Sequence, residues 1–124
     1  MRITAAVDLD ADAVRRLAGQ VLVARTTGAR TIFLPGNHDW AGRSGGESGW
    51  EAIRRQEALI GELGGPQVRM APGGGCPGPW VADLAPVLRL IVLDTQWWLH
   101  SGPKAASAAD GCPTWTEAAV LAAL

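Results

Sequence analysis

The fold of this chain is decided by residues 31–39, Thr-Ile-Phe-Leu-Pro-Gly-Asn-His-Asp. The first four residues are apolar or β-branched, which is the pattern of a buried strand. The strand must stop at Pro35-Gly36, because proline has no N–H group to donate within a sheet. A polar loop follows immediately, and ligands bind at strand ends in open α/β sheets. The stretch therefore predicts an α/β fold whose functional loop begins at residue 36.

A helix is predicted on either side of this stretch. The apolar positions of residues 11–27 recur at helical spacing on one face, and they are Val14, Leu17, Val21 and Leu22. Gly28 stands where a helix often ends in a left-handed residue. Ser48-Gly49-Trp50-Glu51 fits a capping box, which predicts a second helix that runs from Ser48 and ends at Gly64-Gly65-Pro66.

Beyond this helix the pattern changes to short strands and turns. The predicted strands are residues 67–70, 80–84 and 87–94. A hairpin turn at Ala85-Pro86 joins the last two. The run from Arg89 to Leu93 is the most strand-like, and we expect it to be central in its sheet. Residues 101–113 are predicted to form a loop, and Thr114-Trp115-Thr116-Glu117 fits a second capping box that opens a short alanine-rich helix.

The polar loop carries residue types suited to metal-assisted phosphoester hydrolysis. The side-chain oxygen of Asn37 is a neutral, hard ligand for a divalent cation. His38 can protonate a departing alkoxide or neutralise charge on phosphoryl oxygens. Asp39 can hold the imidazole in one orientation and favour its protonated form. Gly36 lets the backbone approach the site closely. The competing interpretation is that residues 36–39 are only a hydrophilic turn, since Gly, Asn and Asp are common in turns.

This loop resembles the Gly-Asn-His-Asp block of calcineurin-like metallophosphoesterases. The flanking residues 33–35 and Trp40 fit that block as well. Further along, residues 75–79 (Gly-Cys-Pro-Gly-Pro) and 92–100 (Val-Leu-Asp-Thr-Gln-Trp-Trp-Leu-His) resemble a bacterial branch of the family. The resemblance covers nearly the whole chain from about residue 11, in the order of the family.

The resemblance implies a β-sandwich flanked by helices, with a dinuclear centre of Mn, Fe, Zn or Mg at strand ends. Asn37 would be a ligand to one metal ion. His38 would contact the phosphate and the leaving group, with Asp39 as its partner. The implied reaction is hydrolysis of a phosphomonoester or diester by a metal-bound hydroxide. The chain would thus be a metallophosphoesterase, a hydrolase, acting on a phosphoester substrate.

A substrate groove is a further expectation at the end of the resemblance. Trp97, Trp98 and His100 could line it, because indole rings stack on a nucleobase or sugar. His100 is equally well explained as a polar residue at a strand end beside partly buried tryptophans. Asp94 is expected to cap a loop rather than to bind a metal.

The sequence departs from the family in its metal ligands. The family has Asp-x-His and Gly-Asp blocks before this loop, then a lone His and a Gly-His-x-His block after it. Residues 1–36 contain no Gly-Asp pair, and His100 is the only later histidine. One amide oxygen cannot hold a metal ion against water. Residues 1–124 are therefore expected to be a single, incomplete metallophosphoesterase domain, a middle segment from a truncated, split or decayed gene that does not retain the metals alone.

The alternative function is a catalytically inactive fragment that acts as a binding or interaction module. Six tryptophans, among them Trp80, Trp97, Trp98 and Trp115, could mark a surface that the missing part of the fold leaves exposed. Unpaired strand edges would then favour self-association.

Three acids near the start of the chain, Asp8, Asp10 and Asp12, allow two more interpretations. They faintly resemble the nucleophile loop of haloacid-dehalogenase-like phosphatases, and their spacing suggests a calcium loop. The calcium loop fails because Ala13 and Gly19 occupy the positions that need Gly and Glu. We favour a solvated helix N-terminus, where acids interact well with the helix dipole.

Composition sets the remaining expectations. The net charge is −1, from 11 basic and 12 acidic residues, so nothing suggests a nucleic-acid binder. No apolar run approaches the roughly 20 residues of a membrane helix, and no signal peptide is recognised, so a cytoplasmic location is expected.

Cys76 and Cys112 are the only cysteines. We expect two reduced thiols in loops, with a disulfide as the alternative for an exported protein.

Overall fold

Two helices form at the positions that their local signals predict. The computed structural model describes residues 11–41 and 46–124, and helix α1 spans Ala11–Thr27 while helix α2 spans Gly49–Gly64. After α1, Gly28 adopts a φ of 69°, as a left-handed C-terminal residue should. Ser48 caps α2, because its hydroxyl accepts a hydrogen bond from the Glu51 N–H while the Glu51 carboxylate accepts one from the Ser48 N–H. The predicted capping box is confirmed.

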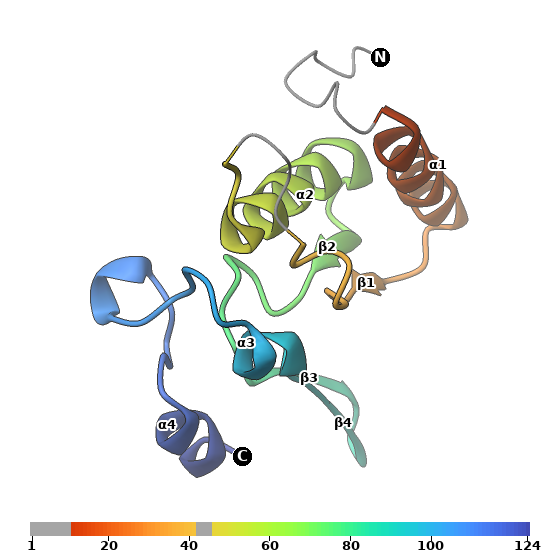
Figure 1. The fold of residues 1–124 in the computed structure, drawn as a ribbon. Helices are drawn as coiled ribbons and strands as arrows, with labels where there is room; N and C mark the ends of the chain where they lie inside the picture. Colours follow the sequence, from red (N-terminus) through yellow and green to blue (C-terminus); the bar gives the residue numbers. More distant parts are fainter. Residues whose placement is uncertain (1–10, 42–45) are drawn as a thin grey trace.

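The first sheet is parallel and contains the strand that precedes the polar loop. Strand β1, Thr31–Phe33, pairs in parallel with strand β2, Val68–Met70, and α2 is the crossover between them. Figure 1 shows α1 and α2 beside these strands. The polar loop thus leaves the carboxyl end of β1, as the sequence predicted, and the structure adds that it does so within a β-α-β unit.

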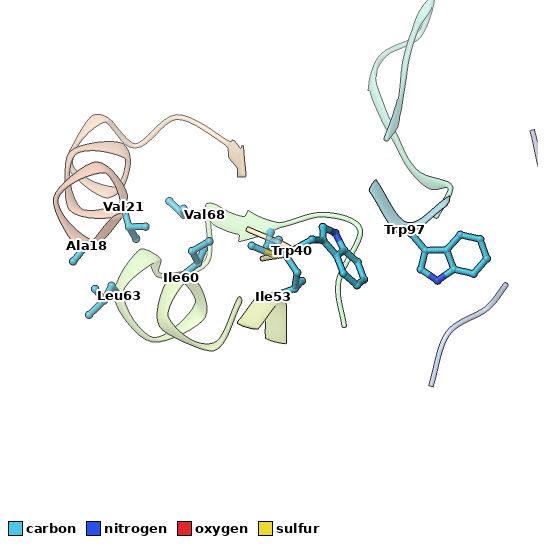
Figure 2. Packing of buried hydrophobic residues seen from close by; sticks show 9 residues of the cluster. Ala18, Val21, Trp40, Ile53, Ile60, Leu63, Val68 and Trp97 are labelled. Carbon is cyan, nitrogen blue, oxygen red and sulfur yellow. The ribbon is translucent and has the colours of Figure 1, made fainter. Parts of the chain in front are cut away.

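The main core lies between α1, α2 and β2. Ala18 and Val21 of α1 meet the buried side of α2 and Val68 of β2 (Figure 2). The buried members of this cluster are Ala18, Val21, Trp40, Ile53, Ile60, Leu63, Val68, Met70 and Trp97. Trp40 and Trp97 extend the cluster away from the helix pair, so the residues just after the polar loop belong to the core.

A hairpin makes the second sheet. Strand β3, Trp80–Ala85, pairs antiparallel with strand β4, Leu88–Val92, through a turn at residues 86 and 87. The expectation that this last strand is central is wrong. Among the described residues β4 pairs only with β3, and Leu88 and Ile91 are 55% and 44% exposed. An apolar run becomes a central strand only when other elements cover it, and here the hairpin projects from the body (Figure 1).

Short helices complete the described part of the chain. Helix α3 spans Thr95–Leu99, a 3-10 helix spans Ala108–Asp110 within the predicted loop, and helix α4 spans Glu117–Ala122. The N-cap of α4 is Thr116, whose hydroxyl accepts a hydrogen bond from the Ala119 N–H. The capping box predicted at Thr114 is therefore wrong, because the Thr114 hydroxyl instead donates to the Gly78 carbonyl.

The whole is a small mixed α/β domain. Each of its two sheets has two strands within residues 11–41 and 46–124. In the same residues, no helix combines the length and the apolar character needed to cross a membrane.

Candidate functional site

The polar loop is a tight turn that its own carboxylate closes. The backbone N–H groups of Asp39 and Trp40 donate to the Gly36 carbonyl, over 3.1 and 3.4 Å. The Asp39 carboxylate accepts a hydrogen bond from the Gly36 N–H at 2.8 Å. Asn37 and His38 lie between these bonds, and both side chains are exposed. The turn therefore presents Asn37 and His38 to solvent from a fixed backbone.

Asp39 is used differently from the expectation. Its carboxylate holds the Gly36 N–H, and no hydrogen bond joins it to His38 within the described part of the chain. The predicted Asp39–His38 hydrogen bond is thus absent among the described residues, where Oδ2 of Asp39 accepts from the Gly36 N–H instead. The interpretation of residues 36–39 as a hydrophilic turn describes the local geometry well, although a turn and a binding loop are not exclusive.

The end of the turn is anchored in the interior by a buried hydrogen bond. Trp40 is 3% exposed, and its indole Nε1–H donates to Oδ2 of Asp94 at 2.7 Å. Asp94 is fully buried and also caps α3, because its Oδ1 accepts a hydrogen bond from the Gln96 N–H at 3.0 Å. Its own backbone N–H donates to the Pro77 carbonyl at 3.0 Å. Asp94 therefore caps helix α3, where the sequence led us to expect the cap of a loop.

Burial dominates the electrostatics of Asp94. Removal from water raises the pKa of the Asp94 carboxyl, while the hydrogen bonds from Trp40 and Gln96 lower it, and the negative charge of Asp39 raises it further. The net direction is upward.

His100 packs against the same tryptophan from the far end of α3. The ring centroids of His100 and Trp40 are 4.8 Å apart. His100 Nε2 is buried and has no hydrogen-bond partner among the described residues. Gly49 completes the contact, because a Cβ at this position would overlap the Trp40 carbonyl oxygen and lie 2.8 Å from Cε1 of His100. The turn, the start of α2 and the end of α3 meet at this point.

The expected tryptophan groove is not formed by Trp97. This side chain is 4% exposed and donates from Nε1 to the Ala105 carbonyl, and Lys104 covers its ring at 4.5 Å. Trp98 is half-buried and meets Trp97 edge-on, with ring centroids 5.4 Å apart. Trp97 is therefore a core residue. Trp98 and the half-buried His100 are the members of the predicted set that retain accessible surface.

The described residues do not complete a metal centre. Within residues 11–41 and 46–124, no group of three or more His, Cys, Asp or Glu side chains could hold a metal ion. Asn37 is exposed, and the nearby carboxylates of Asp39 and Asp94 already accept hydrogen bonds. A dinuclear centre would have to take further ligands from outside these residues.

The early acids fall partly outside the described residues. Asp8 and Asp10 lie there, so the interpretations that depend on them stay predictions. Asp12 stands in the first turn of α1 and forms an exposed ion pair with Arg15 at 3.5 Å. This placement agrees with the preferred interpretation of a solvated helix N-terminus.

Of two long-range links around the loop, the sequence did not predict the first and gave the second only as an alternative. Trp40 and Asp94 are 54 residues apart. Cys76 and Cys112 form a disulfide, so the expectation of two reduced thiols is wrong. Neither link has a local sequence signal. No family model matches this chain, and neither a curated protein nor a solved structure matches it.

Proposed function

We propose that this chain carries the phosphate-binding turn of a calcineurin-like metallophosphoesterase, with a partial form of that fold. In the proposal Asn37 is a ligand to a divalent metal ion, and His38 contacts the phosphoryl group and the leaving group. The substrate class is a phosphomonoester or phosphodiester. The proposal rests on the sequence resemblance and on one structural observation, the rigid turn at the end of β1.

That observation supports binding because the turn is preorganised. Both exposed side chains stand between two hydrogen bonds, from the Asp39 N–H to the Gly36 carbonyl at 3.1 Å and from the Gly36 N–H to the Asp39 carboxylate at 2.8 Å. The buried Trp40–Asp94 bond fixes the end of the turn. A ligand that binds Asn37 and His38 would therefore lose little free energy in ordering the backbone. The position after a parallel strand is also where α/β proteins place their ligands.

The chemistry that these residues can perform is limited to positioning and proton transfer. The exposed imidazole of His38 can donate a hydrogen bond to a phosphoryl oxygen or a proton to the leaving oxygen. The described residues lack a metal site, so attack on phosphorus is not assigned to them. The remaining metal ligands would come from elsewhere in the assembled enzyme.

The test combines metal binding with turnover. Amide and imidazole resonances of the chain are recorded by NMR during titration with Mn²⁺, whose unpaired electrons broaden nearby signals. Hydrolysis of an aryl phosphomonoester and an aryl phosphodiester is measured with the same ion. His38→Ala is the active-site variant, and Gln67→Ala, at an exposed polar position, is the control.

We expect broadening centred on Asn37 and His38, and any Mn²⁺-dependent hydrolysis should fall about 100-fold or more in His38→Ala. Hydrolysis should be unchanged in Gln67→Ala. Broadening at Asn37 without hydrolysis would identify a chain that binds metal but lacks the other ligands. Broadening that spares Asn37, or hydrolysis that His38→Ala leaves intact, would refute the proposal.

A second candidate function is an interaction module, and the β3–β4 hairpin favours it. The hairpin carries exposed apolar side chains on its strands and turn, with Val87 at 97% exposure; the set is Val81, Leu84, Val87, Leu88 and Ile91. Its outer edges are unpaired among the described residues. Sedimentation velocity checks this candidate. Self-association that becomes weaker in Val87→Ser and in Ile91→Thr would support it. A chain that stays monomeric at high concentration would exclude self-association through the hairpin.

A further inference from the structure

The disulfide between Cys76 and Cys112 links two loops that belong to different parts of the chain. Cys76 lies in the loop after β2, and Cys112 follows the 3-10 helix, 36 residues later. Both are buried, with 8% and 5% exposure. Their Cα atoms are 5.5 Å apart, in the usual range for bonded cysteines. The sequence holds no third cysteine, so no other pairing within one chain competes with this one.

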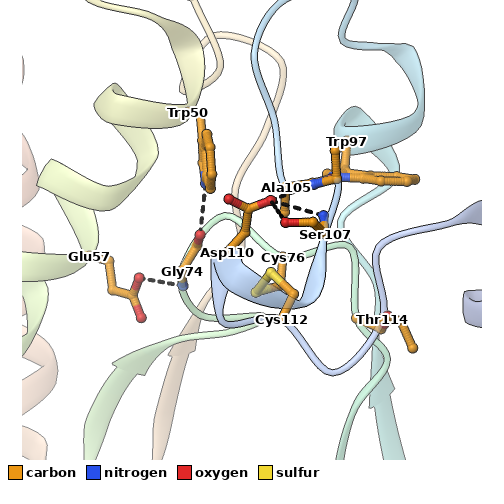
Figure 3. Close-up of a disulfide and its surroundings, with 12 residues drawn as sticks. Trp50, Glu57, Gly74, Cys76, Trp97, Ala105, Ser107, Asp110, Cys112 and Thr114 are labelled. Atoms are coloured by element: carbon orange, nitrogen blue, oxygen red, sulfur yellow. Dashed lines mark hydrogen bonds between the residues drawn. A yellow bond between two sulfur atoms is a disulfide. The ribbon is translucent and has the colours of Figure 1, made fainter.

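On the Cys76 side, the loop is fixed to α2. Trp50 of α2 packs against the disulfide and donates from Nε1 to the Gly74 carbonyl at 2.9 Å. The Gly74 N–H donates to the Glu57 carboxylate at 2.6 Å. Figure 3 shows these two bonds on either side of Gly74, next to the sulfur atoms. The loop that carries Cys76 is thus part of the helical body.

On the Cys112 side, the segment of residues 101–124 joins the rest of the domain through the disulfide and a few other contacts. The Ala105 carbonyl accepts a hydrogen bond from Trp97 Nε1, and the Thr114 hydroxyl donates to the Gly78 carbonyl. Val120 is fully buried.

The segment's local hydrogen bonds close the 3-10 turn around Asp110, which accepts from the N–H groups of Ala106 and Ser107. The small apolar cluster that attaches this segment consists of Ala105 and the two cysteines, with Trp50 against it. Two of the three buried members of this cluster are the bonded cysteines, so the disulfide is the covalent link at this junction.

We propose that this chain matures in an oxidising compartment, where the Cys76–Cys112 disulfide is installed and docks residues 101–124 onto α2. Two thiols lose two protons and two electrons as the S–S bond forms. The electrons reduce the disulfide of a thiol–disulfide oxidoreductase to its dithiol. Buried structural disulfides of this kind persist in exported proteins and are rare in the cytosol. The inference is independent of phosphoester hydrolysis and replaces the cytoplasmic expectation with an exported one.

The chain provides its own probe for docking. Lys104 is the only lysine in the sequence, so a lysine-specific protease cuts the chain at one place. Its ammonium donates to the Trp97 carbonyl at 2.7 Å and lies over the Trp97 ring, which protects the site while the segment is docked. Lys104 also lies between the two cysteines. Cleavage of the oxidised chain therefore leaves fragments 1–104 and 105–124 joined until a reductant is added.

The experiment compares the oxidised chain, the same chain reduced with dithiothreitol, and Cys112→Ser. We expect cleavage at Lys104 to be about tenfold or more faster in the last two, because loop closure no longer opposes opening of the segment. The control is the double variant Cys76→Ser, Cys112→Ser, whose cleavage rate should not respond to dithiothreitol. Equal rates in the oxidised and reduced chains would overturn the docking role.

The compartment is tested on the chain as cells make it. Cells are quenched with acid and treated with a maleimide before the chain is isolated. An unmodified chain that gains two maleimide groups only after reduction supports the proposal. A chain already modified at Cys76 and Cys112 would overturn it.

Discussion

Breaking the bond between Trp40 and Asp94 should destabilise the turn and α3 together. Trp40→Phe removes the indole donor and leaves a buried Asp94 oxygen without it. Asp94→Asn keeps the size of the side chain but offers one oxygen to two donors, the indole and the Gln96 N–H. A hydrogen bond to a charged group contributes about 1.5–3 kcal/mol, and an unsatisfied buried group costs about 1–3 kcal/mol. Each single variant should therefore lose about 2 kcal/mol of unfolding free energy.

The double-mutant cycle isolates the bond itself. The double variant Trp40→Phe, Asp94→Asn should lose about 1–2 kcal/mol less unfolding free energy than the two single variants lose in sum. The first substitution already breaks the bond, so the second substitution does not incur that loss again. Unfolding in urea is followed by far-UV circular dichroism, which does not depend on which tryptophan is replaced. The slope against urea should stay constant across the variants.

A matched cycle with Trp115→Phe is the control. Trp115 is half-buried, and no hydrogen bond joins its indole N–H to Asp94 in the described part of the chain. Its effect should therefore add to that of Asp94→Asn within about 0.5 kcal/mol. Additivity in the Trp40 cycle as well would refute the reasoning, because the 2.7 Å bond would then have no energetic counterpart.

Further predictions concern α2 and the pH dependence of stability. Gly49→Ala should destabilise the chain by more than about 2 kcal/mol, because the new Cβ would overlap the Trp40 carbonyl oxygen. Gly61→Ala has open space around it and should stabilise the chain by up to about 1 kcal/mol. Urea unfolding of the two variants checks both predictions. Ser48→Ala should cost about 1 kcal/mol in the same assay, because α2 loses its cap. The pKa of Asp94 is raised in the folded state, so its contribution favours folding at pH below its usual 3.8 and is lost as the pH rises through the raised value. The wild-type chain should therefore lose stability relative to Asp94→Asn as the pH increases over that range, and unfolding measured at several pH values checks the sign.

Local signals were sufficient for the helical half of the fold. The capping box at Ser48, the left-handed Gly28 and the apolar face of residues 11–27 act over a few residues, and all are confirmed. The predicted stop before Pro35-Gly36 is confirmed as well, although β1 already ends at Phe33 and Leu34, expected in the buried strand, is 56% exposed. These features depend on backbone geometry within one or two turns, which a single sequence records.

Apart from the Asp39–His38 pairing, the main failures involve partners far along the chain. The predicted capping box at Thr114 failed because the Thr114 hydroxyl donates to the Gly78 carbonyl, 36 residues away, and Thr116 caps α4 instead. The apolar run of β4 gave no information on whether another element would cover it. The spacing of Cys76 and Cys112 gave no Cα distance, so the oxidised pair could not be distinguished from reduced thiols. A single sequence shows which groups need hydrogen-bond or packing partners, but it does not show which distant residue supplies them.

These distant partners explain how the exposed turn keeps its shape. Trp40 ends the turn and binds Asp94, and the backbone of Asp94 binds Pro77, the neighbour of Cys76. The turn is thereby connected through one buried carboxylate to the loop that the disulfide holds. These contacts, together with the hydrogen bonds of the turn itself, fix the conformation in which Asn37 and His38 are exposed. The motif carries the chemical groups, while the conformation in which they could act is set by residues about 40 to 55 positions later.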